Sequence, residues 1–351
     1  FNAKRTMQVA QLLYQGFSID GEETGLITYM RTDGTQIAPE AVVETRQVIV
    51  EDFGDEYLPD TMRVYETKAA NAQEAHEAIR PTSLARRPED VKKYLDQDQA
   101  RLYELVWKRT MASQMENARV QRTTITISSE DKLTGLRASG TVITFAGFLK
   151  LYEEGKDDTE DEKEGPNLPQ VSAGESLSVQ KISPEQHFTE PPPRYSEATL
   201  VKRMEELSIG RPSTYASVLS VLRERDYVEM DRNRFIPQDK GRLVVAFLEN
   251  FFERYVEYDF TAELEADLDK VSDGSLSYKE VLARFWEDFH VTVDKTMEIR
   301  NTQILDTMNE VLGAHIFKDT GNGKPRQCPK CGDGELSLKT GRHGAFVGCT
   351  L

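Results

Sequence analysis

The decapeptide GLITYMRTDG, residues 25–34, places a tyrosine, an arginine and an aspartate within five consecutive positions. Its first half is typical of a buried strand and its second half of a turn. If residues 26–31 are extended, their side chains alternate between two faces, so that Ile27, Tyr29 and Arg31 share one face. The tyrosine and the arginine then emerge together.

This site has the residue types that an attack on a phosphate requires. A free phenol has a pKa near 10, so about one in a thousand is ionised at neutral pH. A guanidinium beside Tyr29 lowers the free-energy cost of ionising its hydroxyl. Arg31 can also bind a phosphate oxygen in a bidentate manner and offset the charge of the transition state. Asp33 can orient the arginine or assist a metal-bound phosphate. The alternative is a half-buried tyrosine beside a surface ion pair.

Helical patterns flank this stretch on both sides. Residues 1–16 are amphipathic and end at a glycine, and residues 39–54 begin with a proline and end at another glycine. Residues 98–118 repeat apolar side chains at helical spacing. We therefore predict that about the first 115 residues are mainly helical, with the candidate tyrosine between the first two helices.

The hydrophobic period changes around residue 120. The segments TTITIS, LTGLRASG and VITFAGFLKLY alternate and are rich in β-branched and aromatic residues, which predicts antiparallel strands. Residues 153–165 hold eight acids and two lysines, which predicts a solvated loop. The segment ESLSVQKISPEQHFTEPPP resumes strand character and ends in a stiff proline run. The chain from around residue 120 to this proline run is thus predicted to be rich in antiparallel strands.

Helices return from Tyr195 onward. The expected order is a helix, a tight turn at Gly210, a second helix, a short hairpin and a third helix, as in winged-helix domains. A further amphipathic helix is expected over residues 278–301. In the segment IGRPSTYA, Ser213 or Thr214 can cap the second helix.

The same segment also suits phosphate binding. Free amides at a helix N-terminus, together with Arg211, form a site for an anion, and this hypothesis is compatible with capping. Lys202 and Arg203 would add nonspecific attraction for a nucleic-acid backbone, although a solvated surface explains them equally well.

Charge and hydropathy narrow the class of protein. The 351 residues carry a net charge of −16, so any binding of DNA would depend on a local groove and not on a basic face. No run approaches the roughly 18 apolar residues of a spanning helix, and the N-terminus lacks the features of a secretory signal. The abrupt start within an amphipathic helix leads us to expect a piece of a longer protein.

The cysteines indicate a metal site in the last part of the chain. Cys328 and Cys331 form a C-x₂-C pair, and Cys349 follows after 17 residues. This pattern is typical of a reducing compartment and of the start of a zinc ribbon that lacks its fourth ligand. We expect residues 306–351 to form a linker and an incomplete, mostly disordered zinc site. His343 is an alternative fourth ligand, but its spacing is unusual for a zinc ribbon.

Five blocks together resemble one family. GLITYMRTD resembles the active-site segment of type IA DNA topoisomerases. Further blocks follow in the family's order: AQEAHEAIRPT (72–82), GTVITFAGFLKLY (140–152), SEATLVKRMEELSIGRPSTYASVLSVL (196–222) and VEYDFTAELEADLDKVSDG (256–274). The resemblance covers nearly the whole chain, and GRPSTYA is more similar to the bacterial topoisomerase I branch than to topoisomerase III.

The resemblance implies roles for individual residues. Tyr29 matches the nucleophile that takes the 5′ phosphate, Arg31 matches the arginine beside it, and His76 matches a histidine linked to active-site coupling and proton movement. The matching DNA-contacting positions are Arg211, Ser213 and Thr214. Gly34 departs from the family, which more often has serine there. Without the resemblance, His76 would be an ordinary histidine of a helix that Arg80 and Pro81 end.

The resemblance also implies an architecture and partners. The expected fold is multidomain α+β, with the arch of a toroidal enzyme: a helical nucleophile domain (1–117), an antiparallel β hinge (118–190) with its acidic loop, a winged-helix-like base (191–305) and the tail (306–351). The family's Mg²⁺ is bound by acids of an N-terminal Toprim domain, and Zn²⁺ would belong to the tail. The D-x-D pair Asp267 and Asp269 is an alternative metal site, but it lies on a helical pattern.

The implied activity is the ATP-independent relaxation of negatively supercoiled DNA through transient cleavage of one strand. The partners would be DNA, mainly single-stranded, and the Toprim domain, and the protein would be a cytoplasmic, nucleoid-associated monomer. We expect the chain not to relax DNA alone. The rival hypothesis is a noncatalytic module that binds single-stranded DNA, in which Tyr29 stacks on bases.

Overall fold

The computed structural model describes residues 1–65, 76–152, 168–169, 171–317, 324–342 and 344–351. These residues divide into two compact units, Phe1–Ala198 and Thr199–Leu351, and each is considered by itself. The predicted acidic loop at 153–165, residues 72–75 and His343 lie outside the described residues.

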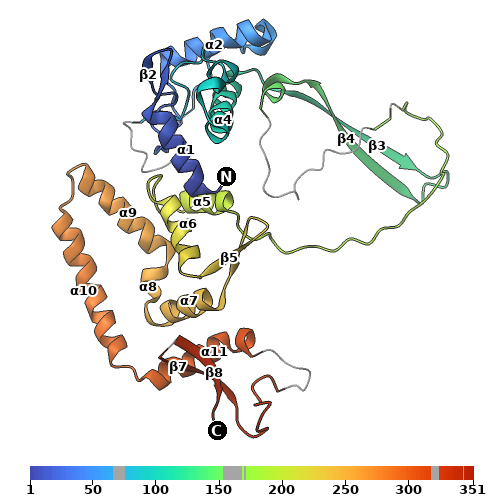
Figure 1. The fold of residues 1–351 in the computed structure, drawn as a ribbon. Coiled ribbons are helices and arrows are strands. Elements are labelled where there is room, and N and C mark those ends of the chain that lie inside the picture. The colour runs from blue at the N-terminus through green and yellow to red at the C-terminus, as the bar shows by residue number, and fades with distance from the viewer. Residues whose placement is uncertain (66–75, 153–167, 170, 318–323, 343) are drawn as a thin grey trace. The chain divides into compact units, whose positions relative to one another are not determined.

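The first unit combines helices with two small antiparallel sheets (Figure 1). Its elements are, in chain order, α1 (Ala3–Gln15), β1 (Phe17–Ile19), β2 (Glu22–Thr24), α2 (Pro39–Phe53), η1 (Asp55–Tyr57), α3 (Pro88–Val91), η2 (Lys92–Tyr94), α4 (Gln97–Gln114), β3 (Arg119–Ser128), β4 (Gly135–Phe145) and η3 (Gly147–Lys150).

The three predicted helices of this unit are confirmed, and their ends have clear causes. Gly16 ends α1 at a φ of 108°, and Gly54 ends α2 at a φ of 96°, both in the region that favours glycine. Asp96 begins α4 with a capping box, in which its carboxylate accepts from the Gln99 backbone amide and the Gln99 side chain accepts from the Asp96 amide.

The core of the first unit lies among α1, α2, α4 and the segment around Tyr29. Its buried apolar residues include Val9, Leu13, Leu26, Ile27, Met30, Val48, Ile49, Leu84, Leu102, Tyr103, Trp107, Met111 and Met115. Because three of them belong to residues 26–30, the candidate site is fixed to the core directly and not through a long loop.

The predicted alternation over residues 26–31 is wrong. Leu26 and Ile27 are adjacent and both buried, and only Ile27 forms a β-bridge, with Pro81. The Leu26 amide donates to the Leu13 carbonyl at the end of α1 instead of to a strand. Both residues therefore bond or pair with neighbouring segments and both side chains are buried, which breaks the period of two.

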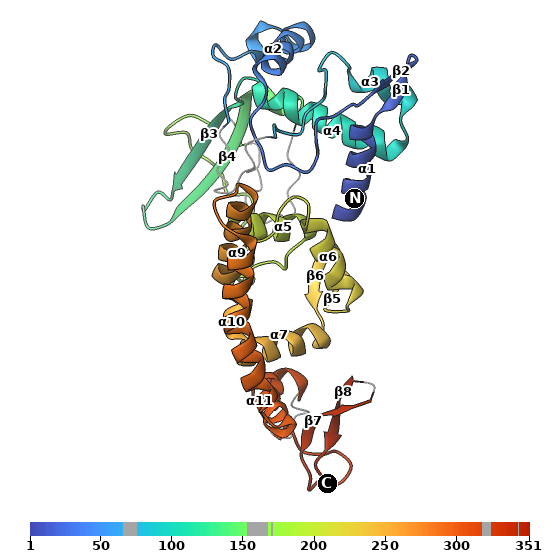
Figure 2. The same cartoon turned by 90° about the vertical axis from the view of Figure 1, so that its left-hand side faces the viewer.

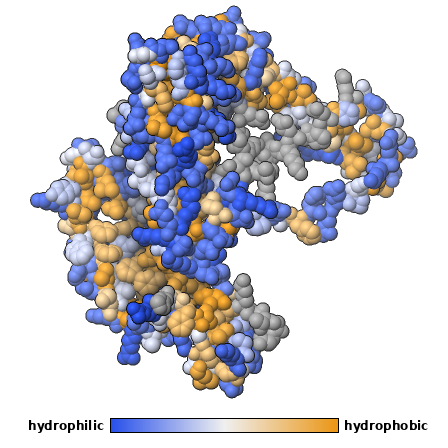
Figure 3. Space-filling view, viewed as in Figure 1, coloured by the Kyte–Doolittle hydropathy of each residue, from blue (hydrophilic) through white to orange (hydrophobic). Residues whose placement is uncertain are grey.

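The β region differs from prediction in two places. The strands β3 and β4 pair over their whole length as one antiparallel ribbon, but the segment after Phe145 turns into η3 and does not continue as a strand. Residues 175–190, predicted as a strand, form no ladder. Apolar side chains stay exposed along the ribbon (Figure 3), with Leu133 exposed to 85% and Leu136 to 57%.

The second unit begins within α5 and contains most of the remaining helices (Figure 2). Its elements are α5 (Glu197–Glu206), α6 (Tyr215–Glu224), β5 (Val228–Asp231), β6 (Arg234–Pro237), α7 (Asp239–Phe251), α8 (Glu253–Val256), α9 (Tyr258–Ser272), α10 (Tyr278–Met297), α11 (Asn301–Ile316), β7 (Leu336–Gly341) and β8 (Gly344–Cys349).

The predicted order of helix, turn, helix, hairpin and helix is confirmed from α5 to α7. Gly210 makes the turn between α5 and α6 at a φ of 78°, and β5 and β6 form the hairpin that precedes α7. The predicted helix beginning at Tyr278 is α10, which packs beside α9. A small core of Ala246, Met308 and Leu338 joins α7, α11 and β7.

The tail is more ordered than predicted. The strands β7 and β8 pair in register from Leu336 opposite Cys349 to Gly341 opposite Gly344. Asn309 of α11 holds this hairpin, because its carboxamide oxygen accepts from the Leu338 amide at 2.7 Å. The expectation of a mostly disordered tail is therefore wrong for the described residues. In the described part of the chain no helix is long and apolar enough to cross a membrane.

Candidate active site

The site is built on two segments that lie side by side, residues 25–38 and residues 76–82. The Thr28 amide donates to the Arg80 carbonyl at 2.9 Å, and the Thr82 amide donates to the Leu26 carbonyl at 3.0 Å. Further along, the Ala78 amide donates to the Gln36 carbonyl at 2.8 Å. The predicted helix through residues 76–80 is therefore wrong, because backbone groups of these residues hydrogen-bond to the neighbouring segment.

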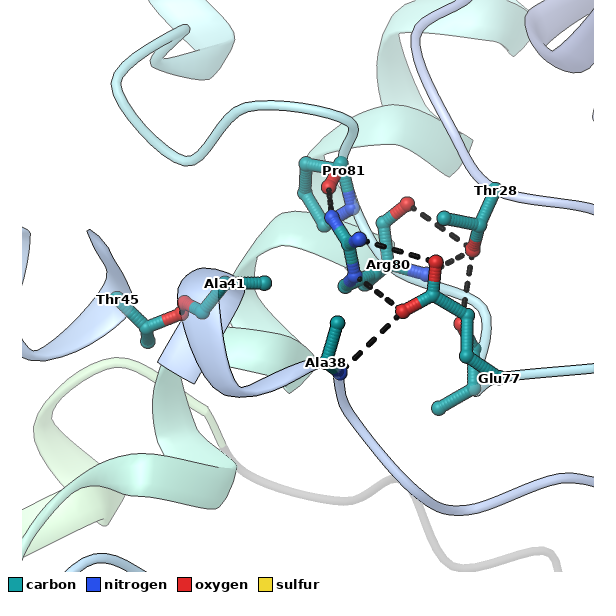
Figure 4. A network of polar contacts seen from close by, with 8 residues as sticks. Thr28, Ala38, Ala41, Thr45, Glu77, Arg80 and Pro81 are labelled. Carbon is teal, nitrogen blue, oxygen red and sulfur yellow. Dashed lines mark hydrogen bonds and ion pairs between the residues drawn. The ribbon is translucent and has the colours of Figure 1, made fainter. Parts of the chain in front are cut away.

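A polar network locks the two segments together (Figure 4). The Thr28 hydroxyl donates to the Ala78 carbonyl at 2.8 Å and accepts from the Arg80 amide at 2.9 Å. The Glu77 carboxylate accepts from Nε and Nη2 of Arg80, at 2.9 and 3.0 Å, and from the Ala38 amide at 3.3 Å. The Arg80 side chain is only 12% exposed, so this bidentate ion pair stabilises the contact between the two segments.

The Tyr29 ring contacts two other rings. Its ring contacts Tyr14 edge to face, with centroids 5.4 Å apart and planes at 72°. On another side it lies 5.0 Å from the His76 ring, at an interplanar angle of 32°. The ring is half-buried, and among the described residues its hydroxyl has no hydrogen-bond partner. The ring is thus held by packing, and its oxygen has no hydrogen-bond partner among the described residues.

The charged neighbours of Tyr29 are accessible. Arg31 is exposed and Asp33 is half-buried, and neither makes an ion pair or hydrogen bond within the described residues. His76 is half-buried against the tyrosine ring. The structure therefore brings Tyr29 and His76 into contact and leaves Arg31 available to an incoming anion.

Two glycines allow the backbones to approach this closely. A Cβ added to Gly25 would lie 2.7 Å from the Tyr14 carbonyl oxygen. A Cβ added to Gly34 would overlap the His76 carbonyl oxygen. Gly34 is the position at which the family more often has serine, so in this chain the segment that carries His76 lies close because residue 34 has no side chain.

Sequence analysis missed Tyr14, Glu77 and Arg80 as parts of the site. A signal for Tyr14 was present in the dipeptide Asp20-Gly21, whose φ values of 52° and 93° make the two-residue turn between β1 and β2. This hairpin returns the chain to the end of α1. The Glu77–Arg80 pair has no comparable signal, because its role depends on a contact with Ala38 far away in the sequence.

In the second unit, Arg211 forms ion pairs with two carboxylates. Its Nη2 lies 2.7 Å from Asp269 Oδ2 and its Nη1 lies 3.6 Å from Glu265 Oε2, both on α9. Nη1 also donates to the Gly210 carbonyl at 2.8 Å, and the side chain is 16% exposed. The guanidinium thus fixes the α5–α6 turn to α9.

The remaining predicted DNA contacts are on the surface of the second unit. Ser213, Thr214 and Lys202 are exposed, and Arg203 is exposed and paired with Glu206 at 3.0 Å. Thr214 occupies the N-cap position of α6 but makes no capping bond, so the predicted cap is wrong. Its hydroxyl accepts from the Arg211 amide at 2.9 Å instead, which tightens the preceding turn.

The D-x-D pair serves helix packing. Asp269 is bound by Arg211, and Asp267 lies 2.6 Å from Arg284 on α10 and 2.9 Å from Lys270. These cations, with the Lys270 hydrogen bond first, hold the pKa of Asp267 below its usual range. The pair therefore joins α9 to α10 and to the α5–α6 turn.

The three cysteines converge as a metal site requires. Their sulfur atoms lie within 4.8 Å of one another, with 3.6 Å between Cys331 and Cys349. Four ligands at about 2.3 Å from a tetrahedral zinc are about 3.8 Å apart, so these three fit that ion. Hydrogen bonds from the Gly334 and Asp333 amides lower the pKa of the Cys331 thiol to about 7, which favours the thiolate that zinc binds.

Comparisons with known proteins agree with this geometry. A family model described as DNA topoisomerase matches residues 1–283. DNA topoisomerase 1 of Rickettsia bellii is 51% identical over 350 residues, covering 100% of this chain and 43% of the relative. DNA topoisomerase 1 of Zymomonas mobilis is 49% identical over 355 residues, covering 100% of this chain and 28% of the relative.

A solved structure extends the likeness to the fold. Full-length topoisomerase I from Thermotoga maritima matches with a TM-score of 0.74 and 33% identity, over 100% of this chain and 53% of that one. The chain therefore spans about half or less of the length of the proteins it matches. With the family model covering most of the chain, this polypeptide belongs to the type IA DNA topoisomerase family.

Proposed function

We propose that this chain carries the nucleophile and strand-binding elements of a type IA DNA topoisomerase. The observation that carries the proposal is the packing of Tyr29 against Tyr14 and His76 with its hydroxyl unpartnered among the described residues. A stacked ring loses little further freedom when it reacts, so the oxygen is already positioned for attack.

The proposed step exchanges one ester for another. Tyr29 Oη forms a bond to the phosphorus of one strand, the bond from phosphorus to the 3′ oxygen breaks, and that oxygen leaves with a proton as a 3′ hydroxyl. The product is a 5′-phosphotyrosine ester, which conserves the energy of the broken bond and lets the reverse attack reseal the strand without ATP.

Individual side chains have separate tasks in this step. The exposed Arg31 guanidinium would neutralise charge on the phosphoryl oxygens. His76, in contact with the Tyr29 ring, would assist proton movement, and Asp33 would orient Arg31. Mg²⁺, held by acids of the Toprim domain of the whole protein, would supply further electrostatic stabilisation of the phosphate.

The rest of the chain would bind the single strand and allow the Tyr29 domain to move. Residues 118–190 would serve as the hinge on which the Tyr29 domain lifts, and residues 191–305 as the base that holds the single strand. Ser213, Thr214 and Lys202 are exposed and fit contacts to phosphates. Arg211 would need to exchange its carboxylates for a phosphate, or would act by shaping the turn. The three thiols would bind Zn²⁺ in the whole protein.

A cleavage assay tests this proposal directly. The chain is mixed with a separately produced Toprim half, Mg²⁺ and a single-stranded oligonucleotide labelled at either end, and adducts are resolved under denaturing conditions. We expect the 3′-end label to stay with the protein and the 5′-end label to be released. No adduct at either end, with both halves folded, would refute the proposal.

The alternative of a noncatalytic single-strand-binding module is favoured by one observation, the three clustered rings of Tyr14, Tyr29 and His76. The variant Tyr29→Phe separates the two functions, because it keeps the stacking ring and removes the hydroxyl. A topoisomerase loses the adduct completely, and a stacking module keeps its affinity with no adduct before or after. The chain alone is expected not to relax supercoiled plasmid, and relaxation without the Toprim half would contradict this.

A further inference from the structure

A second tyrosine, Tyr14, contacts the ring of Tyr29 from outside the polar stretch. It is the next-to-last residue of α1 and is 41% exposed. The two ring centroids lie 5.4 Å apart with their planes at 72°, which is the edge-to-face arrangement that aromatic pairs favour. The reaction proposed for Tyr29 assigns no chemical step to Tyr14, so this contact calls for a separate explanation.

The helix α1 holds Tyr14 in a fixed direction. Val9 and Leu13 of this helix are completely buried in the core of the first unit. Successive side chains of an α-helix are turned by about 100° around its axis. Because α1 cannot rotate without removing Leu13 from the core, the burial of Leu13 also determines where the next side chain, that of Tyr14, is directed.

The segment that leads to the reacting tyrosine packs against the same turn of α1. The Leu26 amide donates to the Leu13 carbonyl at 2.8 Å. A Cβ added to Gly16, which ends the helix, would lie 3.0 Å from the Thr24 carbonyl oxygen, so the two backbones are in direct contact there. The backbone of Tyr14 is therefore held at a fixed place relative to the segment that carries the nucleophile.

The freedom that remains is rotation of the Tyr29 side chain. Its backbone is fixed, because Ile27 and Met30 are buried on either side of it. A side chain can still change between staggered χ1 wells, and the reacting oxygen is at the far end of the ring, so each change displaces that oxygen by several ångströms. A neighbouring ring that favours one well therefore determines where the oxygen lies.

We infer that Tyr14 is a positioning residue for the nucleophile, whose ring holds the Tyr29 ring in the orientation from which Oη attacks the phosphate. The inference rests on the proposed function, in which Tyr29 forms the phosphotyrosine ester. The ring of Tyr14 performs this task, and its hydroxyl is not required. After cleavage, the same contact keeps the phosphotyrosine in place for the returning 3′ hydroxyl.

The rate of adduct formation tests the inference. The full 351-residue chain is mixed with the Toprim half, Mg²⁺ and a range of oligonucleotide concentrations. Tyr14→Leu keeps an apolar side chain and removes the ring. It should slow the reaction at saturating oligonucleotide about three- to tenfold, the range expected for the loss of one edge-to-face ring pair. The half-saturating concentration should not change, because Tyr14 acts through Tyr29 and not through the DNA.

Two further variants separate the ring from its surroundings. Tyr14→Phe should recover the rate, because it restores the ring without the hydroxyl. Leu12→Ala is the matched control, since Leu12 is also 41% exposed and belongs to the same turn of α1. It should change the rate by less than about 1.5-fold. Thermal unfolding of every variant should stay close to that of the unmodified chain, because both positions are exposed.

Fluorine NMR provides a readout that needs no cleavage. Tyr29 is replaced by 4-fluorophenylalanine, which puts one fluorine at the place of the reacting oxygen. We expect a single narrow line in the otherwise unmodified chain and in the Tyr14→Phe and Leu12→Ala backgrounds. In the Tyr14→Leu background the line should broaden or double, because the ring then samples more than one orientation.

Four results would overturn the inference. The first is an unchanged rate in Tyr14→Leu. The second is a higher half-saturating concentration with an unchanged rate at saturation, which would make Tyr14 a DNA contact. The third is an equal loss of rate in Tyr14→Leu and Tyr14→Phe, which would assign the effect to the hydroxyl. The fourth is a fluorine line that stays single and narrow in Tyr14→Leu. If the unmodified chain forms no adduct, the proposed function fails, and the fluorine lines alone decide the inference.

Discussion

Arg31 and Arg211 look alike in the sequence, since each lies in a turn beside hydroxyl-bearing residues. Their exposure and their ion-pair partners in the structure are opposite. Arg31 is exposed in the first unit and has no ion-pair partner among the described residues. Arg211 is 16% exposed in the second unit and contacts Asp269 and Glu265. One guanidinium is left for a ligand, and the other is used to hold a turn against a helix.

The difference teaches where binding energy for DNA can come from. A paired arginine must give up its carboxylates before it binds a phosphate, so its net contribution is small. An unpaired arginine loses only water. We therefore expect the first unit to depend on Arg31 for reaction and the second to depend on Arg211 for stability.

The largest expected effect is on cleavage. Arg31→Ala should slow adduct formation about 10²- to 10³-fold, the usual cost of removing one preorganised donor from a transition state. Arg31→Lys should recover part of the rate, because it restores the charge but not the bidentate geometry. The rates are measured by quenching the oligonucleotide reaction at intervals. Since Arg31 is exposed, thermal unfolding should be unchanged, and a large drop in stability would break the contrast with Arg211.

Gly34→Ser comes next in size and tests how the Tyr29 site is held. The new Cβ would overlap the His76 carbonyl oxygen, so we expect a loss of about 1–3 kcal/mol in the free energy of unfolding of the first unit. Gly135→Ser is the control, because a Cβ there meets nothing within 4 Å. Urea denaturation measures both. Equal stability of the two variants would mean that the His76 segment can shift without cost.

Arg211→Ala should destabilise the second unit by about 1–2 kcal/mol, a value discounted for the partial exposure of both partners. A double-mutant cycle with Asp269→Ala should show favourable coupling between the two side chains. Arg211→Ala should also reduce the affinity of the chain for single-stranded DNA less than Arg31→Ala does. A pair with no coupling energy would instead leave Arg211 free to bind phosphate.

The smallest effect is a dependence on pH. Ion pairing lowers the pKa of Asp267 in the folded protein below the ordinary value of about 3.9. Its contribution to stability is therefore fully present above pH 4 and is lost as the pH falls through the folded-state pKa. Asp267→Asn should flatten this part of the stability curve between pH 4 and pH 2. An unchanged slope in the variant would show that Arg284 and Lys270 do not stabilise the carboxylate.

The helices were predictable because residues within a few positions of each end determine where the helix stops. Gly16 and Gly54 stop α1 and α2, and Gly210 makes the turn that precedes α6, so punctuation and periodicity together were sufficient. The order of elements from α5 to α7 was predicted in the same way. Such signals act over a few residues and do not depend on the rest of the fold.

The failures come from long-range competition. The alternation at Leu26 and Ile27 is lost because α1 bonds the Leu26 amide while residues 80–82 pair with the same short segment, and both side chains become buried. Residues 175–190 alternate in hydropathy but find no ladder partner in the described chain, and alternation alone does not make a strand. Of the candidate site, the contact between Tyr29 and His76 followed only from the family resemblance, and the carboxylates on Arg211 lie more than 50 positions away.

The most direct test of the account is the identity of the residue that DNA modifies. Trypsin should release residues 6–31 as one peptide, which contains both Tyr14 and Tyr29, whose rings lie 5.4 Å apart. After cleavage with the Toprim half and nuclease trimming, fragmentation of this peptide by mass spectrometry locates the attached nucleotide. The account predicts that it is on Tyr29 alone, through a 5′ phosphate. A nucleotide on Tyr14, or an adduct on any other peptide, would contradict it.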